Sequence, residues 1–316
     1  MEYAIMAGVV SLVGGAAAAR FLIGLQLHLR VSQVQKSYGV GLDVEVKGAT
    51  PTMGGLSFIL TAIVALLTQR NSEALFFWSL PISCGLIGFV DDWLKITNKS
   101  SEGFTSLRKL AVQLAVASVW TFWAMSRGVL FLWPGFECPG WVVLPVTILT
   151  TAGMINAVNV TDGLDGLAGG AFLISLGVLA CIVTLPPPGL SGQFAILFGM
   201  AAGFLFYNIH PARIFMGDAG SHFLGGALAA ICVAGGMVMA LIPAAFIFGI
   251  ELLSSAVQIM SIRKFGRKVF RMAPLHHHFQ LIGWAETTVT MRFLLVHAVG
   301  AALTAALGVS IWGLGR

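Results

Sequence analysis

Charged residues are scarce in this sequence. Only 10% of its 316 residues are Asp, Glu, Lys or Arg, whereas about 25% is usual for soluble globular domains. Hydrophobic residues make up 57% of the chain, and its mean hydropathy is +0.90. Such a chain cannot cover the surface of a soluble globule with polar groups. The composition therefore predicts an all-α polytopic membrane protein, because helices satisfy their own backbone groups in lipid.

Cysteine is also scarce, and the sequence shows no linker and no basic residues ahead of its first apolar run. The four cysteines are scattered without a CxxC pair, which argues against a disulfide framework and against a cysteine-based zinc site. No Ser/Pro-rich linker, low-complexity tract or repeat divides the chain, so we expect residues 1–316 to form a single domain. The first apolar run follows Glu2 with no Lys or Arg before it. It therefore lacks the cationic segment of a signal peptide and is interpreted as the first membrane span.

Long apolar runs are what the sequence does contain. A helix needs roughly 20 apolar residues to cross a bilayer. Runs of about this length can be drawn at 4–28, 51–69, 74–90, 107–126, 140–158, 166–185, 190–208, 220–236, 238–260 and 290–313. The pattern predicts about ten transmembrane helices.

The distribution of basic residues predicts the orientation of these spans. Alternate loops hold most of them: Arg30, Lys36, Lys47, Lys95, Lys99, Arg108, Lys109, Arg213, Arg263, Lys264, Arg267, Lys268, Arg271 and Arg292. The loops on the opposite side hold only Arg70, Arg127 and Arg316. The positive-inside rule then places the first set in the cytoplasm and both termini outside. The net charge of +5 suits contact with anionic lipid or phosphate. No nucleic-acid-binding module is visible, and no nucleic-acid partner is expected.

All the aspartates fall on the predicted cytoplasmic side. They are residues 43, 91, 92, 162, 165 and 218. Taken singly, four of them have a structural explanation here: Asp91 and Asp92 as solvated residues at a helix end, and Asp162 and Asp165 near a helix start capped by Thr161. Taken together, converging carboxylates about 6 Å apart would repel by ~3 kcal/mol per pair at an effective dielectric constant near 20. A nearby cation would relieve this repulsion, and carboxylates together with Asn159 and Asn208 offer the oxygen ligands that suit Mg²⁺.

Three adjacent histidines, His276 to His278, follow a strongly basic segment that includes Arg267, Lys268 and Arg271. Consecutive residues of a helix or strand cannot all face one metal, so a zinc site made by this triplet alone is disfavoured. Pro274 interrupts a helix here, and we expect a polar loop whose imidazoles donate to phosphate. The alternative is a patch that binds lipid headgroups.

Five motifs occur in the order known from one enzyme family. They are ATPTMGG (49–55), GFVDD (88–92), NAVNVTDGLDGLA (156–168), YNIHPARIFMGDAGS (207–221) and FRMAPLHHHFQLIGW (270–284). The sequence resembles the phospho-N-acetylmuramoyl-pentapeptide transferases, within the polyprenyl-phosphate N-acetylhexosamine-1-phosphate transferase superfamily. The APLHHHF element is the most discriminating motif.

The resemblance implies a homodimeric enzyme of the bacterial inner membrane with its active site in cytoplasmic loops. Such enzymes use Mg²⁺ to transfer phospho-MurNAc-pentapeptide from UDP-MurNAc-pentapeptide to undecaprenyl phosphate, giving lipid I and UMP. Carried over by motif, Asp91 and Asp92 would act at the lipid phosphate, with Asp91 as base or as nucleophile. Asp218 and Asn159 would hold the metal. Asp162 and Asp165 would line the centre, Lys47, Asn208 and Phe215 would serve the nucleotide, and Lys109, His276, His277 and His278 the phosphates.

Two departures from the family pattern concern specificity. The segment YGVGLDVEVKG lacks the usual Gly-Pro, His and Lys pattern before TPTMGG, and Gln280 replaces a usual Glu. They affect contacts with the sugar or the peptide, so a sibling transferase that uses another UDP-N-acetylhexosamine is an alternative. A transporter is a second alternative, but its ionisable residues should lie near the bilayer midplane. Only Glu251, His222 and His297 are candidates for such a place.

Overall fold

The computed structural model describes residues 2–29, 50–98, 100, 103–182 and 190–312. Within these residues the regular elements are helices, apart from one isolated bridge between Trp133 and Phe136. The helices are α1 (Glu2–Leu29), α3 (Leu56–Gln69), α4 (Ser72–Thr97), α5 (Ser106–Ser126), α6 (Gly140–Thr161), α7 (Leu167–Ile182), α8 (Leu190–Asn208), α9 (Gly217–Ala234), η1 (Val238–Ala240), α10 (Leu241–Ala244), α11 (Phe246–Phe265), α12 (Leu275–Leu281) and α13 (Glu286–Trp312). The all-α prediction is confirmed.

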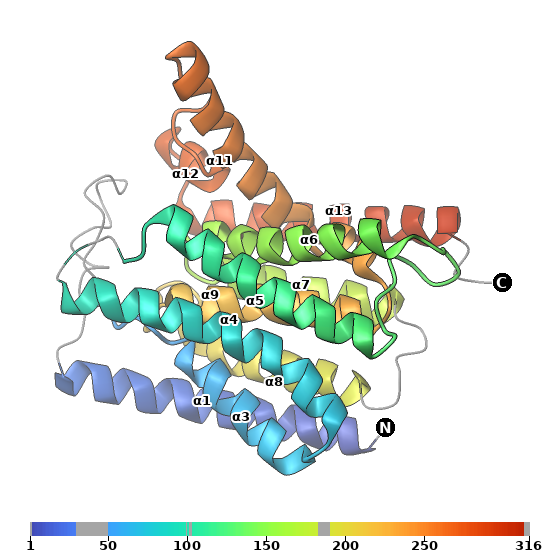
Figure 1. The fold of residues 1–316 in the computed structure, drawn as a ribbon. Coiled ribbons are helices and arrows are strands. Elements are labelled where there is room, and N and C mark those ends of the chain that lie inside the picture. Colours follow the sequence, from blue (N-terminus) through green and yellow to red (C-terminus); the bar gives the residue numbers. More distant parts are fainter. Residues whose placement is uncertain (1, 30–49, 99, 101–102, 183–189, 313–316) are drawn as a thin grey trace.

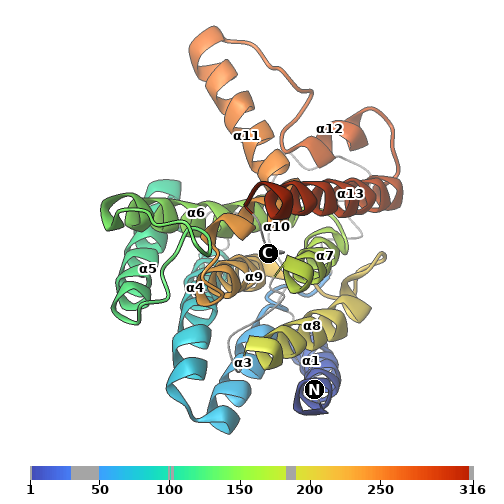
Figure 2. The ribbon, with the colours of Figure 1, turned by 90° about the vertical axis from the view of Figure 1, so that its right-hand side faces the viewer.

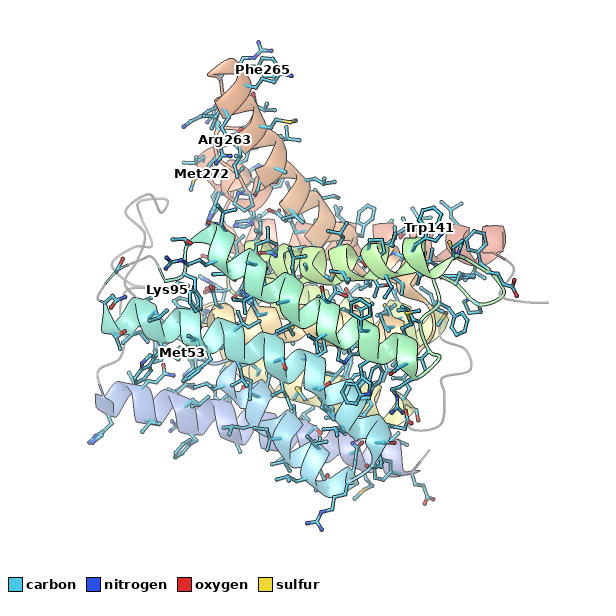
Figure 3. The ribbon with its side chains drawn as sticks, viewed as in Figure 1. Met53, Lys95, Trp141, Arg263, Phe265 and Met272 are labelled. Atoms are coloured by element: carbon cyan, nitrogen blue, oxygen red, sulfur yellow. The ribbon has the colours of Figure 1, made fainter. Side chains whose placement is uncertain are left out.

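Six helices of the described chain are long and apolar enough to cross a membrane, namely α1, α4, α6, α8, α11 and α13. The helices α3 and α7 are apolar but shorter. The chain is therefore a multi-pass membrane protein, while the number of ten spans and their orientation stay predictions. The long helices other than α11 lie side by side, and α1 begins at the end of the bundle where α13 ends (Figure 1). Lys95 and Met53 lie at the opposite end, far from Trp141 (Figure 3).

One predicted span, 238–260, is wrong as a single straight helix. The chain forms η1 and α10, turns at Ala245, and continues as α11, which projects away from the bundle (Figures 1 and 2). Backbone groups at such a buried break need partners. Ser175 Oγ of α7 donates to the Ala244 carbonyl at 2.6 Å, and the Ile247 N–H of α11 donates to His297 Nδ1 of α13 at 3.3 Å. These side chains replace the hydrogen bonds that a continuous helix would have made.

The helix α9 lies at the centre of the bundle and is buried on all sides (Figure 2). Its small residues let neighbouring backbones approach closely. A Cβ on Gly225 would come within 2.6 Å of the Ile155 Cα in α6. A helix that is apolar all round is typical of such a central place. Because α9 is fixed on every side, the residues at its start have defined positions.

Candidate active site

Backbone contacts hold the loop before α9 in place. The N–H groups of Gly54 and Gly55 donate to the carbonyls of Phe215 and Met216 at 2.8 and 2.9 Å. A Cβ on Gly55 would lie 2.0 Å from the Gly220 nitrogen. Only glycine permits an approach this close. The TPTMGG motif therefore packs directly against the FMGDAG motif, although the two are far apart in the sequence.

A second close approach sets the positions of Asp91 and Asp92. A Cβ on Gly88 would come within 2.0 Å of the Asp218 carbonyl oxygen, so α4 touches the start of α9 at this glycine. Asp91 and Asp92 follow Gly88 by three and four residues and therefore share its face of α4. Both are buried, with 0% and 3% exposure. Their interpretation as solvated residues at a helix end is wrong.

Three carboxylates and two lysines form the centre of the site, which we call the carboxylate–lysine cluster (Asp91, Asp92, Asp218, Lys95 and Lys109). One oxygen from each carboxylate lies within 4.8 Å of the others. Lys95 Nζ is 2.7 Å from Asp91 Oδ2 and 3.0 Å from Asp218 Oδ2. Lys109 Nζ is 3.0 Å from Asp91 Oδ2 and 2.6 Å from Asp218 Oδ2. The expected convergence of these three aspartates is present, and ammonium groups compensate their charge.

The carboxylates differ in their remaining partners and in their exposure. Asp91 Oδ1 accepts from the Phe104 N–H at 2.7 Å, and Asp92 Oδ2 accepts from the Ala219 N–H at 3.1 Å. Their side chains are 1% and 4% exposed, against 16% for Asp218. Asp218 is thus the carboxylate of the cluster that a ligand reaches most easily.

Asn159 joins the cluster from α6. Its Nδ2 donates to Asp218 Oδ1 and to Ser221 Oγ, both at 2.9 Å. The set of three carboxylates, one side-chain amide and a partly exposed Asp218 is chemically suited to Mg²⁺, which takes oxygen ligands and completes its shell with water and phosphate. Three carboxyl groups face two ammonium groups, so the fully ionised cluster has one excess negative charge, which favours a cation further.

Asp162 lies in the turn that connects α6 with α7. The expected helix start with Thr161 as its cap is wrong, because Thr161 is the last residue of α6 and its hydroxyl donates back to Ala157 at 2.8 Å. Burial, followed by the carboxylates of Asp218, Asp92 and Asp165, raises the pKa of Asp162 to about 8. Its carboxyl group is therefore mainly protonated at neutral pH and can donate a hydrogen bond.

A second polar group, which we call the loop brace (Asp165, Asn208, His210 and Glu286), connects three loops. Asp165 Oδ2 accepts from the Ala212 N–H at 3.0 Å and lies 3.0 Å from His210 Nδ1. Asn208 donates to the Ile214 carbonyl at 2.9 Å and accepts from the Gly166 N–H at 3.3 Å. Glu286 Oε1 accepts from the Asp165 N–H at 2.8 Å. The brace fixes the Asp162 turn relative to the segment before α9.

The histidine triplet lies in a short helix, so its prediction as a loop is wrong. It belongs to α12, whose N-cap is Pro274. The three rings face different partners, as consecutive helical residues must. His276 Nδ1 lies 3.1 Å from Glu251 Oε2, and His277 Nδ1 lies 2.8 Å from Gln280 Oε1. His278 Nδ1 accepts from the Arg271 N–H at 3.1 Å.

The remaining predicted residues have less defined surroundings. Lys47 lies outside the described residues, and Phe215 is half-buried with its backbone paired to residues 51–54. Sequence reasoning missed Lys95, Glu251 and Glu286 as members of this region. Lys95 was detectable, because it follows Asp91 by four residues and Asp92 by three, the spacing of helical ion pairs. Glu251 and Glu286 meet their partners only through the tertiary fold.

Comparison with known proteins identifies the family. Residues 74–236 match the model of glycosyl transferase family 4. The phospho-N-acetylmuramoyl-pentapeptide-transferase of Shouchella clausii is 39% identical over 282 residues, which cover 83% of this chain and 85% of that protein. The proteins of the same name from a Nostoc species and from Kosmotoga olearia are 36% and 37% identical, covering 93% and 91% of this chain and 84% and 91% of their own lengths. The chain therefore belongs to glycosyl transferase family 4 and, within it, to the phospho-N-acetylmuramoyl-pentapeptide transferases.

Proposed function

We propose that the protein transfers phospho-MurNAc-pentapeptide from UDP-MurNAc-pentapeptide to undecaprenyl phosphate in a bacterial inner membrane, giving lipid I and UMP. The relatives' printed names support this activity. The observation that carries the proposal is the convergence of three carboxylates and two lysines at one end of the helical bundle. A phosphorylated lipid acceptor requires a site at the membrane surface, where its headgroup can meet a water-soluble donor.

The reaction exchanges one phosphorus–oxygen bond for another. An oxygen of the acceptor phosphate forms a bond to the β-phosphorus of the donor, and the bond from that phosphorus to the oxygen of the α-phosphate breaks. UMP leaves with this oxygen. Phosphoryl transfer depends mainly on positioning and on charge neutralisation. The ammonium groups of Lys95 and Lys109 would supply both by moving from carboxylate oxygens to phosphate oxygens.

Asp218 and Asn159 would hold Mg²⁺ in this proposal. When bound, the ion would stabilise the negative charge that develops on the phosphate oxygens. The excess negative charge of the carboxylate–lysine cluster and the exposure of Asp218 support this assignment. Asn159 would orient Asp218 through the hydrogen bond to its Oδ1.

Asp91 and Asp92 would hold the lysine side chains in position. Attack by the acceptor phosphate requires no strong base. A phosphate monoester loses its second proton near pH 6, so the acceptor oxygen is already anionic at neutral pH. Asp91 is almost fully buried, and both of its oxygens have partners within the protein. These facts favour direct attack by the lipid phosphate over a covalent intermediate on Asp91.

The roles of the outer residues follow from their places around the cluster. Asn208 uses its amide group to hold the loop before α9, so its contribution to nucleotide binding would be indirect. Phe215, Lys47, Asp165 and the histidine triplet would contact or shape the sugar-nucleotide site. A homodimer embedded in membrane lipid is the proposed assembly.

The test is an assay of purified protein with UDP-MurNAc-pentapeptide and undecaprenyl phosphate, following UMP release with Mg²⁺ and after EDTA. We expect release to require the lipid phosphate and Mg²⁺. UDP-N-acetylglucosamine serves as the matched control donor. Faster release from that donor would assign the chain to a sibling activity, and no release from either would overturn the proposal.

A further inference from the structure

A buried acid on the projecting helix α11 contacts the first histidine of the triplet. Glu251 and His276 are both 0% exposed. Glu251 Oε1 accepts from the His276 backbone N–H at 3.2 Å, and Glu251 Oε2 lies 3.1 Å from His276 Nδ1. Two contacts from one carboxylate fix both the start of α12 and the orientation of the imidazole ring.

This contact also determines which ring nitrogen carries the proton. A carboxylate can only accept, so Nδ1 must donate. His276 Nε2 has no hydrogen-bond partner among the described residues, although it is buried. A buried polar atom without a partner is unfavourable. Such an atom requires an explanation, and a ligand that supplies the missing contact is one.

The unpartnered nitrogen faces the turn that borders the carboxylate–lysine cluster. A Cβ on Gly163 would lie 2.3 Å from His276 Nε2, so the nitrogen packs directly against the bare backbone of this exposed glycine. The adjacent Asp162 is close enough to Asp218 and Asp92 for their charges to affect its carboxyl group. Nε2 therefore lies against the turn that carries Asp162, next to the cluster where the proposed function places the diphosphate of a sugar nucleotide.

We propose that Glu251 is a positioning residue that holds the proton on Nδ1 of His276 and leaves Nε2, beside Gly163, as the atom that contacts the diphosphate end of the UDP-linked substrate. The inference rests on the proposed function for the identity of that substrate. When Nε2 takes up a proton, the Glu251 carboxylate balances the charge of the ring, and Nε2–H becomes a donor to a phosphate oxygen. A small displacement of the Gly163 turn would bring Nε2–H and the phosphate oxygen together.

The substitution Glu251→Gln tests the positioning role, because an amide has only one accepting oxygen. If that oxygen still accepts from the His276 backbone N–H, the NH₂ group of the amide faces Nδ1. Nδ1 must then accept a hydrogen bond, so the ring proton is on Nε2. Nitrogen-15 NMR of histidine-labelled protein, with His276→Gln used to assign the signal, reads this change directly. We expect Nδ1–H in the wild type and Nε2–H in the variant. The same tautomer in both proteins would overturn the inference, whatever the enzyme's substrate is.

Kinetics give a second and independent reading. Loss of a partner that orients a functional histidine typically reduces activity by about 10- to 100-fold. We expect that loss in kcat for Glu251→Gln, because the neutral amide can no longer balance the charge of a ring protonated on both nitrogens, and a partial recovery for Glu251→Asp, which restores the carboxylate. Ser254→Ala is the matched control, since Ser254 lies one turn along α11 and donates only to the Glu251 backbone carbonyl at 2.7 Å. Turnover of Glu251→Gln within twofold of the wild type would contradict the proposal.

A double substitution separates positioning from simple packing. Glu251→Leu combined with His276→Leu replaces the buried polar pair with apolar groups, which proteins often tolerate without loss of stability. We expect a thermal midpoint near that of the wild type and no recovery of turnover. Recovery of turnover would show that the pair has only a structural role. An inactive wild-type protein would instead refute the proposed function, while the NMR result would still decide the role of Glu251.

Discussion

The carboxylate–lysine cluster and the loop brace both contain buried acids, but different partners stabilise them. Asp218 Oδ2 accepts from two ammonium groups, those of Lys95 and Lys109. Asp165 Oδ2 instead accepts from a backbone N–H, that of Ala212, and lies beside the His210 ring. The turn of residues 162–165 lies between the two groups, so neighbouring acids of one region have different kinds of partner.

This difference in hydrogen-bond partners distinguishes side chains that take part in the reaction from side chains that hold the loops in place. A lysine ammonium group sits on a flexible side chain and can transfer from a carboxylate to a phosphate without any change in the backbone. A backbone N–H cannot leave its acceptor unless the loop itself moves. Substitutions in the carboxylate–lysine cluster should therefore impair turnover more than stability, and substitutions in the loop brace should do the reverse.

The largest expected effect is that of Asp218→Asn. The substitution keeps the shape but removes the charge that faces two lysines and the proposed metal ion. We expect turnover to fall by about 10³-fold or more, since metal stabilisation contributes several kcal/mol and each 1.36 kcal/mol is about tenfold in rate. The thermal midpoint without substrate should change little, because repulsion from Asp91 and Asp92 is relieved. Near-normal Mg²⁺-dependent turnover would remove Asp218 from the proposed metal site.

A smaller effect is expected for Lys109→Met. The substitution removes one of two ammonium groups and leaves three carboxylates with a single counter-charge. We expect turnover to fall by roughly 10²-fold, the usual scale for loss of one group that stabilises developing charge. The thermal midpoint should also fall, in contrast to Asp218→Asn. Lys109→Arg is the control, and it should keep most of the stability while losing part of the turnover. Equal turnover in the Met variant and the wild type would exclude Lys109 from the chemistry.

The loop brace should respond in the opposite sense. Asp165→Ala leaves the Ala212 N–H without its acceptor, and the loss of a buried hydrogen-bond partner costs about 1–3 kcal/mol. We expect the thermal midpoint to fall by several degrees while kcat stays within about fivefold of the wild-type value. A scan of detergent-solubilised protein, paired with the UMP assay, measures both. A loss of kcat as large as that of Asp218→Asn, with unchanged stability, would move Asp165 into the reacting group.

The sequence showed what would follow if the aspartates converged, and the family resemblance placed Asp91, Asp92 and Asp218 in one site. Asp91, Asp92 and Asp218 all fall in predicted cytoplasmic segments, and mutual repulsion of carboxylates requires a cation wherever they meet. The role of Lys95 in neutralising these carboxylates was missed, because Lys95 was used only as evidence for the orientation of the membrane spans. Its spacing from Asp91 was sufficient to predict the ion pair.

Other features could not be predicted because they depend on contacts between distant segments. Pro243 is a local signal for the break at Ala245, but the partners from α7 and α13 that stabilise the break are not visible in residues 238–260. The backbone contact between Gly88 and Asp218 likewise exists only when α4 packs against α9. The histidine triplet was predicted as a loop because Pro274 ends helices, yet proline is equally suited to precede one.

The smallest expected effect, and the most specific, is the pH dependence of stability in Asp162→Asn. Between pH 4 and pH 8 the folded protein keeps a proton on Asp162 that the unfolded chain loses, since burial and the neighbouring carboxylates raise the pKa of Asp162 to about 8 from its ordinary value of 3.8. Stability of the wild type must then fall as pH rises through this window and level off above pH 8. The side-chain amide of the variant does not titrate, so the variant lacks this slope.

The thermal midpoint of Asp162→Asn minus that of the wild type should be near zero at pH 4, grow through neutral pH, and reach a plateau of a few degrees above pH 8. The side chain is half-buried, and solvent screening limits the effect. Scans in EDTA without substrate exclude contributions from bound metal. A difference that is constant with pH would mean that the Asp162 carboxyl group is ionised at neutral pH in the folded protein. The turn between the cluster and the loop brace would then present a further negative charge to the substrate diphosphate instead of a hydrogen-bond donor.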